Sequence, residues 1–176
     1  MKKNLKEIID YIEDVRGMLL DTINNCDSEK FVKKEDPGRW SVMENVNHLH
    51  LSEIQINSIF AKLVDKAEQR GFAPDKSNKS WLNSLDEYSI NEVKEKINAP
   101  SFAVPVENKN RDELNGLLVA SRIELLSIVE KLSQYDMTKL EFPHPMTRGR
   151  MNLYQWLVFL GKHEERHIKQ IKELIV

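Results

Sequence analysis

The sequence lacks the features that mark secreted, nucleic-acid-binding and membrane proteins. It contains one cysteine, Cys26, so no disulfide can form within the chain, which is typical of a reducing cytoplasm. Its 26 Lys and Arg and 28 Asp and Glu give a formal charge of −2, without the basic excess of a nucleic-acid-binding protein. No apolar run approaches the roughly 20 residues of a membrane span. We therefore expect a cytoplasmic protein with no nucleic-acid or membrane partner.

Alternation typical of β-strands is also missing, and helical periodicity takes its place. Apolar residues recur every three or four positions in four segments, which begin near Asn4, Ser41, Asn110 and Asn152. The last three segments open with patterns typical of a capped first helical turn. Gly71 marks the end of the second segment. The 176 residues suit a single domain, so we predict one all-α domain that spans the whole chain.

The connections between these helices predict their order. Antiparallel neighbours need only about 2–8 connecting residues, but the second and third helices are separated by residues 71–109. A helix of this length measures on the order of 35–40 Å, and a connection this long can return along it. The sequence therefore predicts a four-helix bundle of up-down-down-up order, with a long crossover between helices two and three. We expect a short helix within the crossover at residues 89–97.

The motif H-E-E-R-H, residues 163–167, matches the zinc-protease pattern H-E-x-x-H. In one form of that site a third ligand follows six residues later, after a glycine that turns the chain. Here that position is Glu173, and Gln170 occupies the position of the glycine. On a continuing helix Glu173 lies about 240° around the axis from His167. The pattern does not favour a metalloprotease, and Glu164 and Glu165 are expected on a solvated face.

The histidines favour a different metal site. His163 and His167 are four residues apart, so they share the apolar face of the last helix. A buried imidazole needs a hydrogen-bond partner or a metal. A third ligand must come from upstream, where His48 and His50 flank the apolar stripe of the second helix on opposite edges. Periodicity does not choose between them. His144 lies between two prolines and is expected to be a surface turn residue.

Two blocks of sequence resemble the DinB/YfiT family of four-helix-bundle metalloproteins. The first is W-S-V-M-E-N-V-N-H-L-H-L-S-E, residues 40–53. The second is H-P-M-T-R-G-R-M-N-L-Y-Q-W-L-V-F-L-G-K-H-E-E-R-H-I-K-Q-I, residues 144–171. The resemblance extends in the same order over nearly the whole chain. It implies that the metal ligands are His48, His163 and His167.

Other residues are candidates for the surroundings of that site. With His48 as the implied ligand, His50 becomes a neighbour. Glu53 points into the apolar stripe of the second helix, where an unpaired carboxylate would be costly. We expect it to pair with Arg122 of the third helix. Trp156 and His144 are further candidates for the pocket.

Three neutral imidazoles would leave coordination positions for water or substrate, as in catalytic sites. Histidine-only sites accept a divalent Zn, Ni, Fe or Mn ion, which lowers the pKa of a bound water or thiol. Proteins of the resembled family include thiol S-transferases that use bacillithiol or mycothiol, and many are dimers. The resemblance implies a homodimeric transferase that activates a low-molecular-weight thiol against a small-molecule substrate. The alternatives are a metal-dependent hydrolase of a small amide or ester, and a non-catalytic metal-binding stress or interaction protein.

Overall fold

The computed structural model describes the chain except residues 1, 89, 91–97, 107, 145–148 and 176. Most of it is helical, as predicted. The four long helices are α1 (Lys3–Asn24), α3 (Val42–Arg70), α4 (Arg111–Leu132) and α5 (Leu153–Ile175). The connections contain the short helix α2 (Ser28–Val32), the 3-10 turns η1 (Asp86–Tyr88) and η3 (Ser101–Ala103), and the strands β1 (Glu141–His144) and β2 (Gly149–Asn152).

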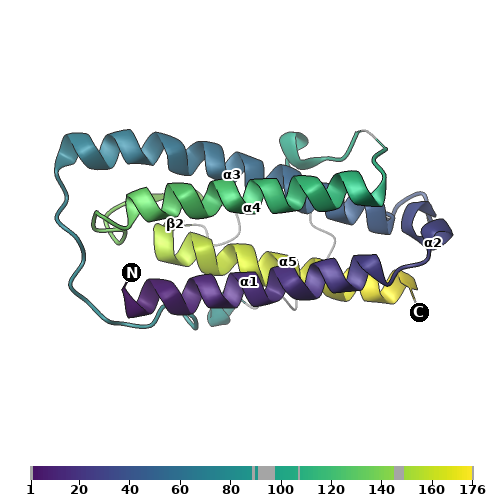
Figure 1. Ribbon diagram of the computed structural model, residues 1–176, viewed down its shortest axis with the longest axis horizontal. Helices are drawn as coiled ribbons and strands as arrows, with labels where there is room; N and C mark the ends of the chain where they lie inside the picture. Colours follow the sequence, from purple (N-terminus) through teal and green to yellow (C-terminus); the bar gives the residue numbers. More distant parts are fainter. Residues whose placement is uncertain (1, 89, 91–97, 107, 145–148, 176) are drawn as a thin grey trace.

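The long helices lie side by side (Figure 1). The largest contacts join α1 to α5 and α3 to α4, and α3 also packs on α5. The colours in Figure 1 show that α1 and α5 run in one direction along the long axis, and α3 and α4 in the other. Apolar residues at helical spacing on α1 are fully buried in the core: Leu5, Ile8, Ile12, Val15, Leu19 and Ile23. Among the helices that the structure describes, none is long and apolar enough to cross a bilayer.

Local hydrogen bonds set the helix ends, as the sequence predicts. At the start of α3, Ser41 Oγ accepts from the Glu44 N–H at 3.2 Å, and the Glu44 carboxylate accepts from the Ser41 N–H at 2.8 Å. Asn152 and Gln155 form the same reciprocal pair before α5, with both distances 3.1 Å. Gly71 closes α3 in the left-handed conformation, with φ 59°, which a residue without Cβ adopts at little cost.

The crossover connects the end of α3 to the start of α4. Trp81 in this segment stacks on Tyr154 of α5, with ring centroids 5.6 Å apart and planes 7° apart. Farther along the crossover, η3 packs against α3. The predicted short helix at 89–97 lies outside the described residues, apart from Ile90.

The prediction that the chain has no strands is wrong. Strands β1 and β2 form an antiparallel hairpin in which Glu141 is opposite Asn152. Four-residue strands are too short to display alternation, and β1 contains Pro143, a residue that is rare within strands. The hairpin packs on the first turn of α5. The Trp156 indole N–H donates to the Phe142 carbonyl at 3.4 Å, and the two rings stack with centroids 4.0 Å apart.

Candidate metal site

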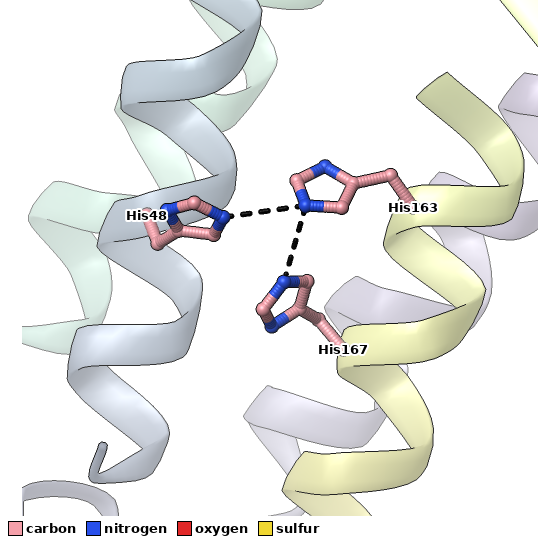
Figure 2. Close-up of side chains that lie close together, drawn as sticks. All are labelled: His48, His163 and His167. Atoms are coloured by element: carbon pink, nitrogen blue, oxygen red, sulfur yellow. Dashed lines mark hydrogen bonds between the residues drawn. The ribbon is translucent and has the colours of Figure 1, made fainter. Parts of the chain in front are cut away.

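Three histidines from two helices converge at one point (Figure 2). His48 comes from α3, and His163 and His167 come from α5. The Nε2 atom of His163 lies 3.2 Å from the Nε2 atom of each of the other two. The three candidate ligand atoms lie within 4.8 Å of one another. Within the described part of the chain, no other three His, Cys, Asp or Glu side chains converge in this way.

Neighbouring oxygens fix the proton positions on two of the rings. The Nδ1 atom of His48 lies 2.7 Å from the carbonyl oxygen of Ala103 in η3, and Nδ1 of His167 lies 2.8 Å from Oδ1 of Asn45. The Asn45 amide is oriented by its Nδ2 group, which donates to the Ser41 carbonyl at 2.8 Å. Because these oxygens only accept, each Nδ1 carries the proton. A lone pair therefore remains on each Nε2, as in metal-bound histidines.

Electrostatics keep all three rings neutral. Burial is the main cause that lowers the pKa of His48, and it lowers the pKa of His163 and His167 well below 6.5. The positive charge of Arg166 on α5 lowers the pKa of each ring further. His163 keeps some contact with solvent although protein atoms surround it densely. Neutral imidazole is the form that binds a metal ion.

This donor set fits a divalent cation. The Nε2–H of a neutral His163 can satisfy only one of the two lone pairs that face it, whereas a cation can accept lone pairs from all three rings. Two nitrogens that each lie about 2.0–2.1 Å from a tetrahedral zinc are about 3.3 Å apart, close to the 3.2 Å separations seen here. No carboxylate or thiol joins the cluster among the described residues, so coordination positions are left for a small ligand.

Aromatic side chains flank the cluster on two sides. The Trp40 ring lies 4.7 Å from the His48 ring and stacks on His167 at 6.3 Å. The Phe159 ring stacks on His163, with centroids 5.4 Å apart and planes 10° apart. Together these rings place apolar surface on both flanks of the three imidazoles. Phe159 was not among the predicted site residues, although it precedes His163 by four residues and so lies on the same face of α5.

Trp156 and His144 lie behind Phe159, one ring away from the histidine cluster. The ring centroids of Trp156 and His144 are 5.5 Å and 4.3 Å from that of Phe159. The expectation that His144 is a surface turn residue is wrong, since it is 5% exposed. The β1–β2 hairpin folds it against α5, and burial lowers its pKa to about 4. Both residues support the rings that line the cluster.

A second buried polar cluster lies between the helices, and we call it the ion network. Glu53 accepts from Arg122 Nε at 2.8 Å and from Arg16 Nη2 at 3.0 Å. Glu164 accepts from Arg16 Nε at 3.1 Å and from Arg122 Nη2 at 2.9 Å. The predicted Glu53–Arg122 pair is confirmed. The expectation that Glu164 is solvated is wrong: it is 3% exposed, because two buried guanidinium groups require two carboxylates.

His50 does not join the three histidines. It is buried, and its Nδ1 has no hydrogen-bond partner among the described residues. Burial is the main cause that lowers its pKa, and the charges of Glu53 and Arg16 also act on it. Two of its electrostatic neighbours are therefore members of the ion network, and Lys109 is a third neighbour outside it. Glu165, the other glutamate expected on a solvated face, is half-buried and hydrogen-bonds Tyr11 of α1.

Comparisons with known proteins show which family this chain resembles. The family model of the DinB superfamily matches residues 11–171, which include all three histidines of the cluster. An uncharacterized protein, YuaE of Bacillus subtilis (strain 168), is 23% identical over 156 residues, which cover 86% of this chain and 87% of that protein. No solved structure is significantly similar to this chain. Because the family model matches most of its length, this chain belongs to the DinB superfamily.

Proposed function

We propose that this protein is a metal-dependent enzyme in which His48, His163 and His167 hold a divalent Zn, Ni, Fe or Mn ion. The observation that carries the proposal is the convergence of three neutral imidazoles at separations that suit one ion. A structural zinc site would ordinarily have four protein ligands, and the described residues supply three. The bound ion would act as a Lewis acid and lower the pKa of a thiol or water bound to it.

The reaction that we propose is transfer of a low-molecular-weight thiol to a small electrophile. His48 and His167 present their Nε2 atoms because Ala103 and Asn45 hold the opposite nitrogens. Trp40, together with Phe159, supplies apolar walls beside the cluster. A thiolate is a strong nucleophile once water is kept from it. The protein's part in the reaction would be to position the thiol and to exclude water.

The scaffold and setting belong to the same proposal. We propose an up-down-down-up four-helix bundle, and the helix contacts and directions in Figure 1 support it. The long connection from α3 to α4 suits two neighbours that run in parallel. We also propose that the protein works in the cytoplasm as a homodimer, which the single cysteine and the family resemblance respectively favour.

Metal content tests the ligand assignment before any substrate is known. Purified His48→Ala, His163→Ala and His167→Ala variants are each expected to lose the ion that the wild type retains, because two imidazoles bind it far more weakly than three. His50→Ala is the matched control and should keep a full equivalent. The readout is elemental analysis of folded protein, with folding checked by circular dichroism. Loss of metal in His50→Ala but not in His48→Ala would show that the assignment is wrong.

Turnover distinguishes the three functions. The metal-loaded protein is mixed with a small thiol and monochlorobimane, and the fluorescence of the conjugate is followed. Thiol-dependent turnover that disappears in His163→Ala supports the transferase. Hydrolysis of small amides or esters without added thiol would instead indicate a hydrolase. A loaded protein that does neither would be a metal-binding protein without turnover, and a wild type that takes up no metal would overturn the proposal.

A further inference from the structure

The crossover reaches the candidate metal site through residues 98–106, which we call the strap. Ala103 in η3 is the one buried residue of the strap, at 1% exposed. Phe102 and Val106 are 53% and 86% exposed, so their apolar side chains do little to hold the strap against the helices. The attachment of the strap to the bundle is therefore concentrated at Ala103.

Within the described part of the chain, one hydrogen bond joins the strap to a helix. It connects His48 Nδ1 on α3 with the carbonyl oxygen of Ala103 at 2.7 Å. The other hydrogen bonds of the strap are internal. The Ala103 N–H donates to the Pro100 carbonyl at 2.9 Å, and the Val104 N–H donates to the Ser101 carbonyl at 3.4 Å. A proline lies at each end of this turn and restricts its backbone, so the turn moves toward or away from α3 as a unit.

The His48 ring connects the strap to the metal site. Its Nε2 faces His163 at 3.2 Å, whereas its Nδ1 points away from the cluster to Ala103 (Figure 2). A cation at Nε2 draws electron density from the ring, which makes the Nδ1–H a stronger donor. Metal binding and attachment of the strap therefore strengthen each other, and linkage requires that both effects have the same size.

We propose that the strap is a metal-responsive element, in which a divalent ion at the three histidines fastens Ala103 to His48. The attached strap in turn holds His48 in the orientation that binds the ion, so Ala103 is a positioning residue that acts through its backbone carbonyl. A hydrogen bond from a charged donor exceeds one from a neutral donor by enough to shift an equilibrium about 10-fold. This inference rests on the proposed metal site and adds a conformational change that reports its occupancy.

Amide hydrogen exchange, followed by NMR in zinc-free and zinc-loaded protein, tests the effect of the metal on the strap. The Ala103 amide exchanges when its turn opens, and we expect zinc to slow this exchange about 10-fold. The Tyr135 amide is an internal control, since it donates to the Leu132 carbonyl at 3.0 Å in a short turn after α4. Its exchange rate should be the same with and without zinc.

Two matched variants test the effect of the strap on the metal. Ala103→Gln places a longer, polar side chain at the buried position and should displace the strap from α3. We expect it to weaken zinc binding by about 10- to 100-fold, as measured by competition with a chromophoric chelator. It should also abolish the effect of zinc on exchange of the Val104 amide. Phe102→Gln introduces the same side chain at the adjacent exposed position and should retain the wild-type affinity. Circular dichroism is expected to show native helix content in both variants, because the strap lies outside the four long helices.

The outcomes separate this inference from the proposed function. If zinc binds the wild type without slowing exchange at Ala103, the strap does not respond to the metal, although the metal site stands. If Ala103→Gln and Phe102→Gln bind zinc equally well, the contact with His48 does not support the ligand, and the inference is overturned in the same way. If zinc does not bind the wild type, both the metal site and the inference are overturned.

Discussion

At the scale of single residues, the donor set depends on two oxygens that are not ligands. The Ala103 carbonyl holds the proton on one side of His48, and the Asn45 amide does the same for His167. Such partners orient the imidazole and raise its basicity. Asn45 is also tied to the backbone of Ser41, so its position follows from the start of α3. The geometry of the cluster is therefore coupled to the cap of that helix.

Asn45→Ala is expected to weaken the protein's affinity for a divalent ion by about 10- to 100-fold. His167 would then lose the acceptor that fixes its tautomer and its ring orientation. Affinity is measured by competition with a chromophoric chelator. Asn115→Ala is the control, because it removes an amide that donates to Asn24 at 2.8 Å in a different part of the protein. Equal affinities for Asn45→Ala and the wild type would show that the hydrogen bond does not support the site.

At the scale of elements, one glycine sets the contact of α1 with α5. Gly161 lies on α5, between Phe159 and His163, and the Tyr11 ring of α1 packs directly over it. A Cβ at Gly161 would overlap the Cε1 and Cζ atoms of that ring. Gly116 on α4 has no atom within 4 Å of an equivalent Cβ. Alanine at Gly161 would therefore test both close packing and helix propensity, whereas alanine at Gly116 would test helix propensity alone.

We expect Gly161→Ala to lower the free energy of unfolding by up to about 2 kcal/mol, since overpacking that pushes Tyr11 or the helix aside costs about 1–3 kcal/mol. This cost outweighs the roughly 1 kcal/mol that alanine gains over glycine in a helix. Gly116→Ala is expected to be neutral or stabilising by up to about 1 kcal/mol. Urea denaturation followed by circular dichroism measures both. A stabilised Gly161→Ala variant would contradict the close contact.

Helix positions could be predicted because their signals are local, but helix faces were harder to assign. Helical spacing from Leu114 favours Leu117 for the buried stripe of α4, whereas the structure buries Leu118 and leaves Leu117 only partly covered. The reason is that α4 also carries apolar residues on its solvent side, with Val119 47% and Ile123 64% exposed. Periodicity alone cannot select a face when both are apolar. The α5 stripe is clearer, and it correctly placed His167 inward.

Parts of the site that depend on distant segments left no signal in the sequence. The spacing of His163 and His167 is local and could be found, whereas periodicity could not choose His48 over His50. The acceptor for His48 is a backbone carbonyl 55 residues away, which any residue type could provide. The two partners of Glu164 are arginines 148 and 42 residues away. Charges in the sequence do not reveal which partners the fold will bring together.

At the scale of the whole molecule, the ion network joins all four long helices. Arg16, Glu53, Arg122 and Glu164 come from α1, α3, α4 and α5 in turn. Each is at most 4% exposed. Removing one partner leaves a buried charge uncompensated, which typically costs about 3–5 kcal/mol. The network therefore restricts how α5, with its two histidines, can rotate against the other helices.

Acid unfolding should report this network through Glu53. Burial alone would raise the pKa of its carboxyl, but Arg16 and Arg122, together with a hydrogen bond from Ser121, hold the pKa below 4.5. A carboxylate with a lowered folded-state pKa stabilises the protein fully above its unfolded pKa, and that stabilisation is lost as the pH falls through the folded value. The contribution of Glu53 should therefore be complete above about pH 4.5 and decline below it.

Glu53→Gln should consequently be less stable than the wild type by roughly 3 kcal/mol near pH 7. The difference should narrow as the pH falls below about 4.5, because the Glu53 carboxyl then takes up a proton first in the unfolded state and, at lower pH, in the folded state. The measurement is the free energy of unfolding in urea at a series of pH values from neutral down to about pH 3. Glu130→Gln, at an exposed position on α4, should follow the wild-type curve. A gap between Glu53→Gln and the wild type that stays constant across this range would mean that the Glu53 carboxylate is not held by the two arginines.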